Sequence, residues 1–193
     1  MTLADSPSIS PIQRAHQGGF FWAVDRAHRI QTILDVASQL PKLVVITGSM
    51  SETSDVSERL TLRGLPVMAA SDLADPRPVT FFDSTATVAL VTTAEYIGEH
   101  CPIWSSMTIH LRLPFSVRSY IERLKCSKSA VHVTFVSPED HQRSEELRSA
   151  LSPHPTPPGD AGVDLTRLLD LATSKVAAKV ETPRRRLNFR GVS

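Results

Sequence analysis

The sequence predicts a single α/β domain of three layers, in which helices cover both faces of a mainly parallel sheet of about five strands. Short β-branched runs alternate with stretches whose apolar residues recur at helical spacing. This alternation is typical of parallel strands joined by right-handed crossovers. The length of 193 residues allows one sizeable domain with appendages. Apolar runs place the five strands at 43–47, 66–69, 88–92, 107–111 and 131–136.

Two helices flank the first of these strands. Apolar positions from Val24 to Leu40 recur at helical spacing and stop before Pro41, which predicts a helix ahead of the strand. Ser49 and Glu52 have the spacing of a capping box, so the next helix should begin directly after the strand. An Arg-Gly pair ends that second helix.

Two further helices are predicted in the second half of the domain. One spans about 117–125, between the last two strands. The other begins at the run 137–140, which supplies a serine N-cap, a proline for the first helical position and acidic side chains for the first turn. This last helix should end near Leu151.

The ends of the chain differ in character from the domain at 20–151. Residues 1–19 show little periodicity and predict a flexible leader, and four prolines make 152–162 a stiff linker. Residues 163–180 have an amphipathic pattern, which predicts a helix that docks on the core or on a protein partner. Residues 181–193 predict a disordered basic tail. The tail arginines that could meet RNA or an acidic partner, or only aid solubility, are Arg184, Arg185, Arg186 and Arg190.

Composition and charge exclude several classes of protein. A net charge of +1 gives no global field toward nucleic acid or anionic membranes, so a basic binding surface would be local. No apolar run approaches the ~20 residues of a membrane span, and no secretory signal pattern opens the chain, so we expect no membrane partner and a cytoplasmic location. Cys101 and Cys126 lack metal-ligand spacing and suit ordinary core packing in a reducing compartment. The seven histidines form no zinc pair, so no metal is expected.

Several runs carry more information than periodicity does. The run 109–114 ends in Leu-Pro and is followed six residues later by Tyr120. With the strand–helix run 43–60, the strand 88–93 and the helical pattern at 20–40, it resembles the second RecA-like domain of superfamily 2 (DEAD-box type) helicases. The resemblance covers roughly 20–151 and implies a RecA-like fold.

The resemblance also implies contacts with nucleic acid. Thr93 falls on the family threonine that contacts the nucleic-acid backbone, and Gly98 matches a glycine of the same motif, whereas Ala94 replaces an aspartate. Without the resemblance, the positions at the end of strand 88–93 are better explained as a plain loop. A basic cluster of Arg118, Arg123, Lys125 and Lys128 could hold a phosphate backbone, but a solvated surface explains it slightly better. The candidate residues for binding RNA or another single-stranded nucleic acid are Ser49, Thr92, Thr93, Gly98, Arg123, Lys125 and Lys128.

ATP hydrolysis is not expected from this chain alone. Cys126 and Ser129 stand where the family has the two arginines that neutralise the transferring phosphate, and lysines replace two glycines of the same motif. The sequence contains no Gly-x-x-x-x-Gly-Lys-Ser/Thr phosphate loop. We therefore expect no catalytic residue and no cofactor, with ATP bound only if a partner domain completes the site.

Three functions remain open from the sequence. The first is a degenerate helicase-like domain that binds nucleic acid or assembles a complex without hydrolysing ATP by itself. The second is a protein-interaction scaffold, which the near-neutral net charge favours. The third is half of a split ATP-dependent helicase, in which Lys125 or Lys128 would replace an arginine.

Overall fold

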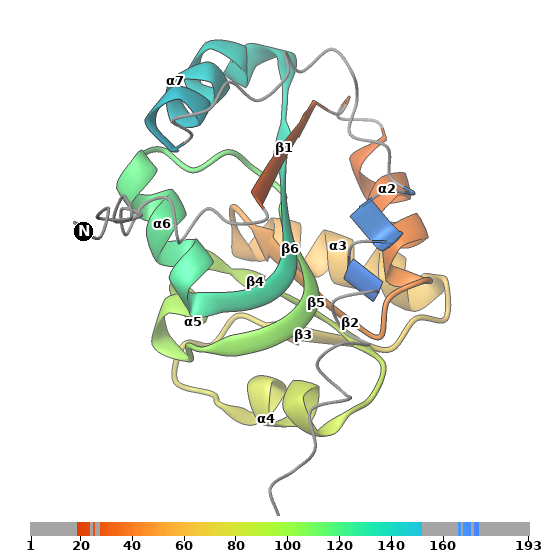
Figure 1. Ribbon diagram of the computed structural model, residues 1–193. Coiled ribbons are helices and arrows are strands. Elements are labelled where there is room, and N and C mark those ends of the chain that lie inside the picture. Colours follow the sequence, from red (N-terminus) through yellow and green to blue (C-terminus); the bar gives the residue numbers. More distant parts are fainter. Residues whose placement is uncertain are drawn as a thin grey trace, which may run out of the picture.

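A six-stranded sheet with helices on both faces forms the described part of the chain (Figure 1). The computed structural model describes residues 19–23, 25, 28–151, 166, 168–170 and 172–173. The strands are β1 (Gly19–Ala23), β2 (Lys42–Thr47), β3 (Val67–Ala70), β4 (Val88–Thr93), β5 (Ile103–His110) and β6 (Ser127–Val136). The helices are α2 (Arg29–Ala37), α3 (Met50–Leu62), α4 (Arg77–Ser84), α5 (Ala94–Glu99), α6 (Val117–Cys126) and α7 (His141–Leu151), with a 3₁₀ turn at Pro138–Asp140 before α7.

The strand order is β1-β6-β5-β2-β4-β3, and every neighbouring pair is parallel. Both faces of such a sheet are covered, so its central strands are apolar along their whole length. All six residues of β4 and five of the six in β2 are buried. The predicted α/β class, with a parallel sheet between two helical layers, is confirmed.

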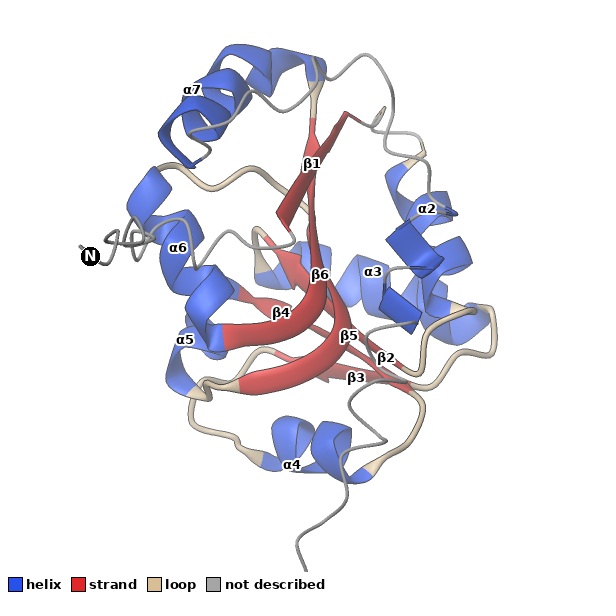
Figure 2. Ribbon diagram, viewed as in Figure 1, coloured by secondary structure: helices blue, strands red, loops and turns tan. Residues whose placement is uncertain are grey.

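The helices divide between the two faces of the sheet (Figure 2). α2 and α3 cover one face, where Leu168 and Ala172, from the segment predicted as an amphipathic helix, are buried in the same cluster. α4 and α5 cover the other face, where Phe82 and Tyr96 are fully buried. α6 lies beside them and packs against α7 through Leu147. Among the described residues, no helix has the length and apolar character needed to cross a membrane.

β1 is the strand that the sequence pattern does not predict. Residues 20–40 were expected to be helical, but Gly19–Ala23 pairs with β6, and α2 begins only at Arg29. The helical prediction for 20–23 is therefore wrong. Aromatic residues favour strands, yet a strand of five residues is too short to show a clear period of two.

Three further differences affect the functional site. The short helices α4 and α5 were not predicted, because eight and six residues give little periodic signal. α5 is nonetheless capped by Thr93, whose side chain accepts a hydrogen bond from the Tyr96 amide. β6 begins at Ser127 instead of residue 131, so it follows α6 without a loop.

The carboxyl ends of the parallel strands meet at one edge of the sheet. After β2 the chain turns into α3, on one face, whereas after the neighbouring β4 it turns into α5, on the opposite face. Connections that leave toward opposite faces open a crevice beyond the strand ends, and open α/β folds hold ligands in this place.

Candidate functional site

A groove of about 920 Å³ lies at this carboxyl edge. Its walls come from the ends of β2, β4 and β5, from the segment after β6, and from α5 and α6. The groove is lined by six carboxylates and four guanidinium groups, so negative charge is in excess. The charged lining residues are Arg29, Glu52, Asp55, Glu95, Arg112, Glu122, Arg123, Glu139, Asp140 and Arg143.

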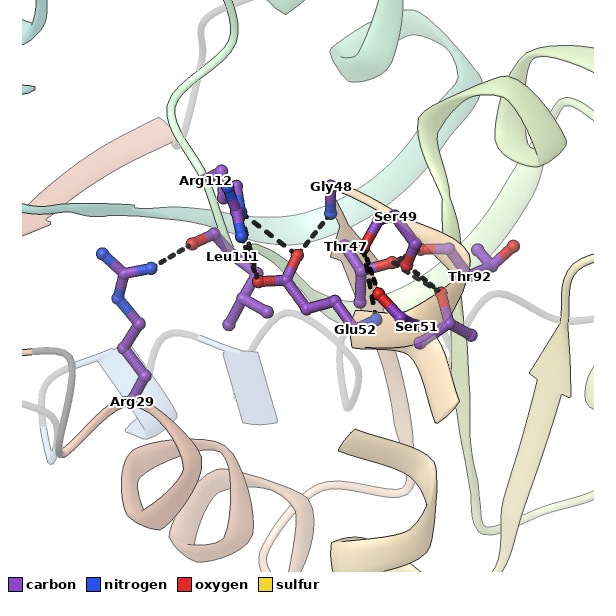
Figure 3. A network of polar contacts seen from close by, with 10 residues as sticks. Arg29, Thr47, Gly48, Ser49, Ser51, Glu52, Thr92, Leu111 and Arg112 are labelled. Carbon is purple, nitrogen blue, oxygen red and sulfur yellow. Dashed lines mark hydrogen bonds and ion pairs between the residues drawn. The ribbon is translucent and has the colours of Figure 1, made fainter. Parts of the chain in front are cut away.

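The side chain of Glu52 lies at the N-terminus of α3 (Figure 3). Its carboxylate accepts the Gly48 amide at 2.6 Å and the Arg112 guanidinium at 3.1 Å from both Nε and Nη2. The Glu52 amide in turn donates to the Ser49 hydroxyl at 3.2 Å, which forms the N-cap half of the predicted capping box, while the carboxylate binds the amide one residue earlier, at Gly48. A helix N-terminus attracts anions, and here the chain's own carboxylate occupies that place.

Gly48 lies close to Arg112. A Cβ at this position would lie 2.7 Å from the Arg112 Cδ atom, so a larger residue would require the arginine side chain to shift. Arg29 donates to the Leu111 carbonyl at 3.3 Å on the other side of the same groove (Figure 3).

The two predicted threonines are engaged inside the fold. The Thr92 hydroxyl is fully buried and donates to the Ala70 carbonyl at 2.7 Å, which takes it away from the groove. Thr93 is 7% exposed, and its hydroxyl caps α5. The Thr47 hydroxyl lies in the same network, 2.6 Å from that of Thr53.

Three of the predicted residues lie at or beside the groove. Gly98 and Arg123 line it, and the exposed Ser49 follows Gly48 at its rim. Burial lowers the pKa of Arg123, and the neighbouring charge of Glu95 opposes this shift. The structure therefore brings Ser49, Gly98 and Arg123 to one edge of the sheet.

The predicted lysines lie apart from this group. Lys125 and Lys128 are exposed, and neither lines the groove. Lys128 is opposite Trp104 in the β5–β6 register, near the amino ends of these strands. Arg118, which the sequence places in the same basic cluster, forms an ion pair with Glu122 at 3.0 Å. The cluster is thus divided between the groove and the amino end of β6.

Ser129, at the second of the two family arginine positions, faces a buried cluster of hydroxyl groups. Its Oγ lies 2.6 Å from that of Ser105 and also contacts Thr108, which in turn contacts Ser127. Cys126, at the first position, is partly buried against the core and lines the groove. Neither position presents a cation.

A buried group of polar rings lies between α6 and the sheet, and sequence reasoning missed it. His110 is fully buried, with its ring centroid 5.7 Å from that of Tyr120 and 5.9 Å from that of His132. Burial first, and then His132 and Arg123, hold the pKa of His110 well below its usual range. Burial also raises the pKa of Tyr120 to about 12. Histidine on a strand that is otherwise apolar is the signal that could have revealed this group.

Phe115 is a groove residue that sequence reasoning missed. It follows the Leu-Pro pair, is 88% exposed and lines the groove. The Arg143 guanidinium lies 5.6 Å from the centre of its ring and also pairs with Asp140. Large exposed aromatic side chains beside arginine are typical of protein interfaces.

Two of the predictions concern the C-terminal part of the chain. The tail arginines Arg184, Arg185, Arg186 and Arg190 lie outside the described residues. Of the segment 163–180, the described residues Leu168, Leu169 and Ala172 pack on the chain's own core, so these side chains are not available to a partner. Within the described ranges, no group of three metal-ligating side chains occurs.

Comparison by sequence finds no relative: no family model matches the chain, and no curated protein matches it. Comparison of the structures, in contrast, finds proteins with a similar fold. A variant of the S. cerevisiae Dbp5 C-terminal domain, bound to a variant of Gle1 and to IP6, aligns with a TM-score of 0.59 and 13% identity, over 81% of this chain and 96% of that chain. The fold is that of a DEAD-box helicase C-terminal domain.

Two longer helicase chains share this helicase-like fold. A DEAD-box protein from Methanococcus jannaschii aligns with a TM-score of 0.55 and 12% identity, and Chaetomium thermophilum Prp28 bound to ADP with 0.56 and 14%. Each alignment covers 68% of this chain but only 39% and 35% of the respective helicase. The resemblance inferred over roughly 20–151 is confirmed at the level of the fold.

Proposed function

We propose that this helicase-like domain assembles protein complexes and does not hydrolyse ATP on its own. The observation that carries the proposal is the pairing of charges in the groove. Glu52 pairs with Arg112 and Asp140 with Arg143, and carboxylates outnumber guanidinium groups along the lining. A nucleic acid gains affinity when unpaired cationic side chains of the protein neutralise its phosphates. This groove offers few such side chains.

An exposed aromatic side chain gives a protein partner a place to bind. Phe115 is the most exposed large apolar residue of the described chain, and Arg143 lies over its ring. Aromatic and arginine side chains dominate the binding energy of protein interfaces. The Dbp5 domain, which shares the fold, is bound to the protein Gle1 in its structure, and this also supports a protein ligand.

Binding of single-stranded RNA is the second candidate. Arg123 favours it, because this arginine lines the groove and forms no ion pair with the other described residues within 4.0 Å. Gly98 lies in the same wall and leaves open space beside its backbone. RNA is nonetheless the weaker candidate, since one available arginine neutralises one phosphate.

Two measurements on the full chain distinguish these functions. Affinity capture followed by quantitative mass spectrometry should yield partners that Phe115→Ala loses at least tenfold and that Phe81→Ala retains. Phe81 is the matched control, an exposed phenylalanine on α4 that lies outside the groove.

Fluorescence anisotropy with a labelled single-stranded RNA provides the second measurement. We expect no binding tighter than about 100 µM at low salt. Micromolar binding that is lost in Arg123→Glu, together with identical captured proteins for both phenylalanine variants, would overturn the proposal in favour of RNA.

A further inference from the structure

The two cysteines lie together in the fold, although the sequence suggested unrelated packing residues. Cys101 stands two residues before β5, and Cys126 is the last residue of α6, directly before β6. The register pairs Ile103 with Ser127, the first residues of these two strands, so both cysteines sit at the amino end of one strand pair. Cys101 is close enough to Cys126 to contribute to the raised pKa of that thiol, and both cysteines are free.

The strand register brings the two positions near the spacing that a disulfide needs. Such a bond needs Cα atoms within about 7 Å of each other, and neighbouring strands lie about 4.8 Å apart. Each cysteine is within two residues of the Ile103–Ser127 pair. The contact of α5 with α6 holds the two chain segments side by side (Figure 1).

The two thiols differ in access to solvent. Cys101 is exposed, whereas Cys126 is partly buried against the apolar cluster that contains Ile97 and Ile103. Burial, and then the neighbouring Cys101, raise the pKa of Cys126 to about 11, although Lys128 opposes the shift. Cys126 therefore stays protonated at neutral pH, and a dissolved oxidant meets Cys101 first.

We propose that Cys101 and Cys126 are a redox pair, in which hydrogen peroxide oxidises Cys101 and Cys126 then closes an intramolecular disulfide. In the first step the Cys101 thiolate attacks a peroxide oxygen, the O–O bond breaks, and hydroxide leaves a sulfenic acid behind. In the second step the Cys126 thiol gives up its proton, and its sulfur attacks that of Cys101. The S–O bond breaks, and the departing hydroxide takes the proton as water. The two thiols lose two electrons, and peroxide is reduced to two molecules of water.

The disulfide has a structural consequence. It ties the end of α6 to the segment that follows α5 and closes the loop 102–125. Cys126 lines the carboxyl-edge groove, so the bond fixes one of its walls. Closing a loop of this length restricts the unfolded chain and raises the melting temperature by about 5–10 °C.

Intact mass spectrometry of the full chain tests the proposal. Treatment with hydrogen peroxide should lower the mass by about 2 Da and remove both free thiols, and dithiothreitol should restore them. Trypsin can cut between the cysteines at Arg112, Arg118, Arg123 and Lys125, so the bond appears as a link between two separate peptides.

Two serine variants test the order of the steps. Cys126→Ser should accumulate a sulfenic acid on Cys101 that dimedone traps, whereas Cys101→Ser should leave Cys126 unmodified at the same dose. Since Cys101 is exposed, its serine variant is expected to fold normally. Two thiols that persist in the folded wild type, disulfides only between two chains, or dimedone adducts on Cys126 instead of Cys101, would each overturn the proposal.

Discussion

At the residue scale, Glu52 organises the groove at the carboxyl edge of the sheet. Its side chain is 18% exposed and satisfies both the Gly48 amide and the Arg112 guanidinium. A carboxylate at a helix N-terminus is favoured by the helix dipole, and hydrogen bonds to charged groups are stronger than neutral ones. Because the chain supplies this anion itself, the start of α3 needs no phosphate from a ligand.

Replacing Glu52 should therefore be costly. We expect Glu52→Ala to lower the free energy of unfolding by about 1–2 kcal/mol, because the capping box and the Arg112 pair are lost together. Asp55→Ala is the control, since its pair with Arg59 is more than half exposed on both sides and should cost less than about 0.5 kcal/mol. Urea unfolding of the two variants measures both values, and equal losses would contradict the special role of Glu52.

His110 makes stability depend on pH. The folded chain keeps this buried ring neutral, with Tyr120, His132 and Arg123 facing it, whereas the unfolded chain protonates it below about pH 6.5. Below this pH the unfolded state binds more protons than the folded state. The contribution of His110 to stability is therefore constant above about pH 6.5 and falls below it.

The expected slope from His110 is about 1.4 kcal/mol per pH unit between pH 6.5 and the lowered pKa of the folded state. His110→Leu should remove this contribution, and His28→Leu, at an exposed position, should leave it in place. Chemical unfolding from pH 7 to pH 5 provides the measurement. An unchanged slope in His110→Leu would rule out this histidine as the source.

At the scale of the element, α6 and β6 join directly. α6 ends at Cys126 and β6 begins at the next residue, so the two residues that the helicase resemblance compares with arginines, Cys126 and Ser129, lie at the end of a helix and the start of a strand. The hydroxyl groups around Ser129 take up the space that faces β5.

The segment that contains Leu168 is a second element with a testable role. Leu168 is fully buried in the cluster formed by α2, α3 and the sheet. We expect Leu168→Ala to cost about 2–4 kcal/mol of unfolding free energy, because it removes a core side chain and leaves a cavity. Leu62→Ala, at a position that is 78% exposed on α3, should change stability by less than about 0.5 kcal/mol. A similar small change in both would mean that the segment does not contribute to the core.

At the scale of the whole molecule, the described chain corresponds to one RecA-like unit. It covers 96% of a helicase C-terminal domain but only 35–39% of two longer helicase chains. Phosphoryl transfer depends on a phosphate loop, a metal-binding aspartate and an arginine that all reach one nucleotide. This chain has no phosphate-loop pattern in its sequence, and the helicase resemblance compares Cys126 and Ser129 with the two family arginines.

We accordingly expect ATP turnover at background level for the full chain, with or without single-stranded RNA. A coupled phosphate-release assay measures it, with a complete DEAD-box helicase as the positive control. Turnover that RNA stimulates and that Arg123→Ala abolishes would instead show a complete site.

The positions that the sequence predicted best are those where the local pattern is strong. The N-cap at Ser49 occurs as expected, and so do the buried strands at the centre of the sheet. Thr92 and Thr93 show that a motif does not predict which partner a side chain will contact. Both lie at a strand end as predicted, yet one hydroxyl is buried against Ala70 and the other caps α5. Neighbouring strands and helices decide such orientations, and a single sequence does not contain them.

The sequence by itself determined the α/β class, the order of the central strands along the chain and the absence of a Gly-x-x-x-x-Gly-Lys-Ser/Thr run, because periodicity and residue identity are local properties. Only the tertiary structure decided which side chains lie together at one edge of the sheet. It separated Lys125 and Lys128 from the groove, placed Phe115 beside Arg143, and brought Cys101 to Cys126. The physical reason is strand register: pairing β5 with β6 fixes contacts between residues far apart in the chain.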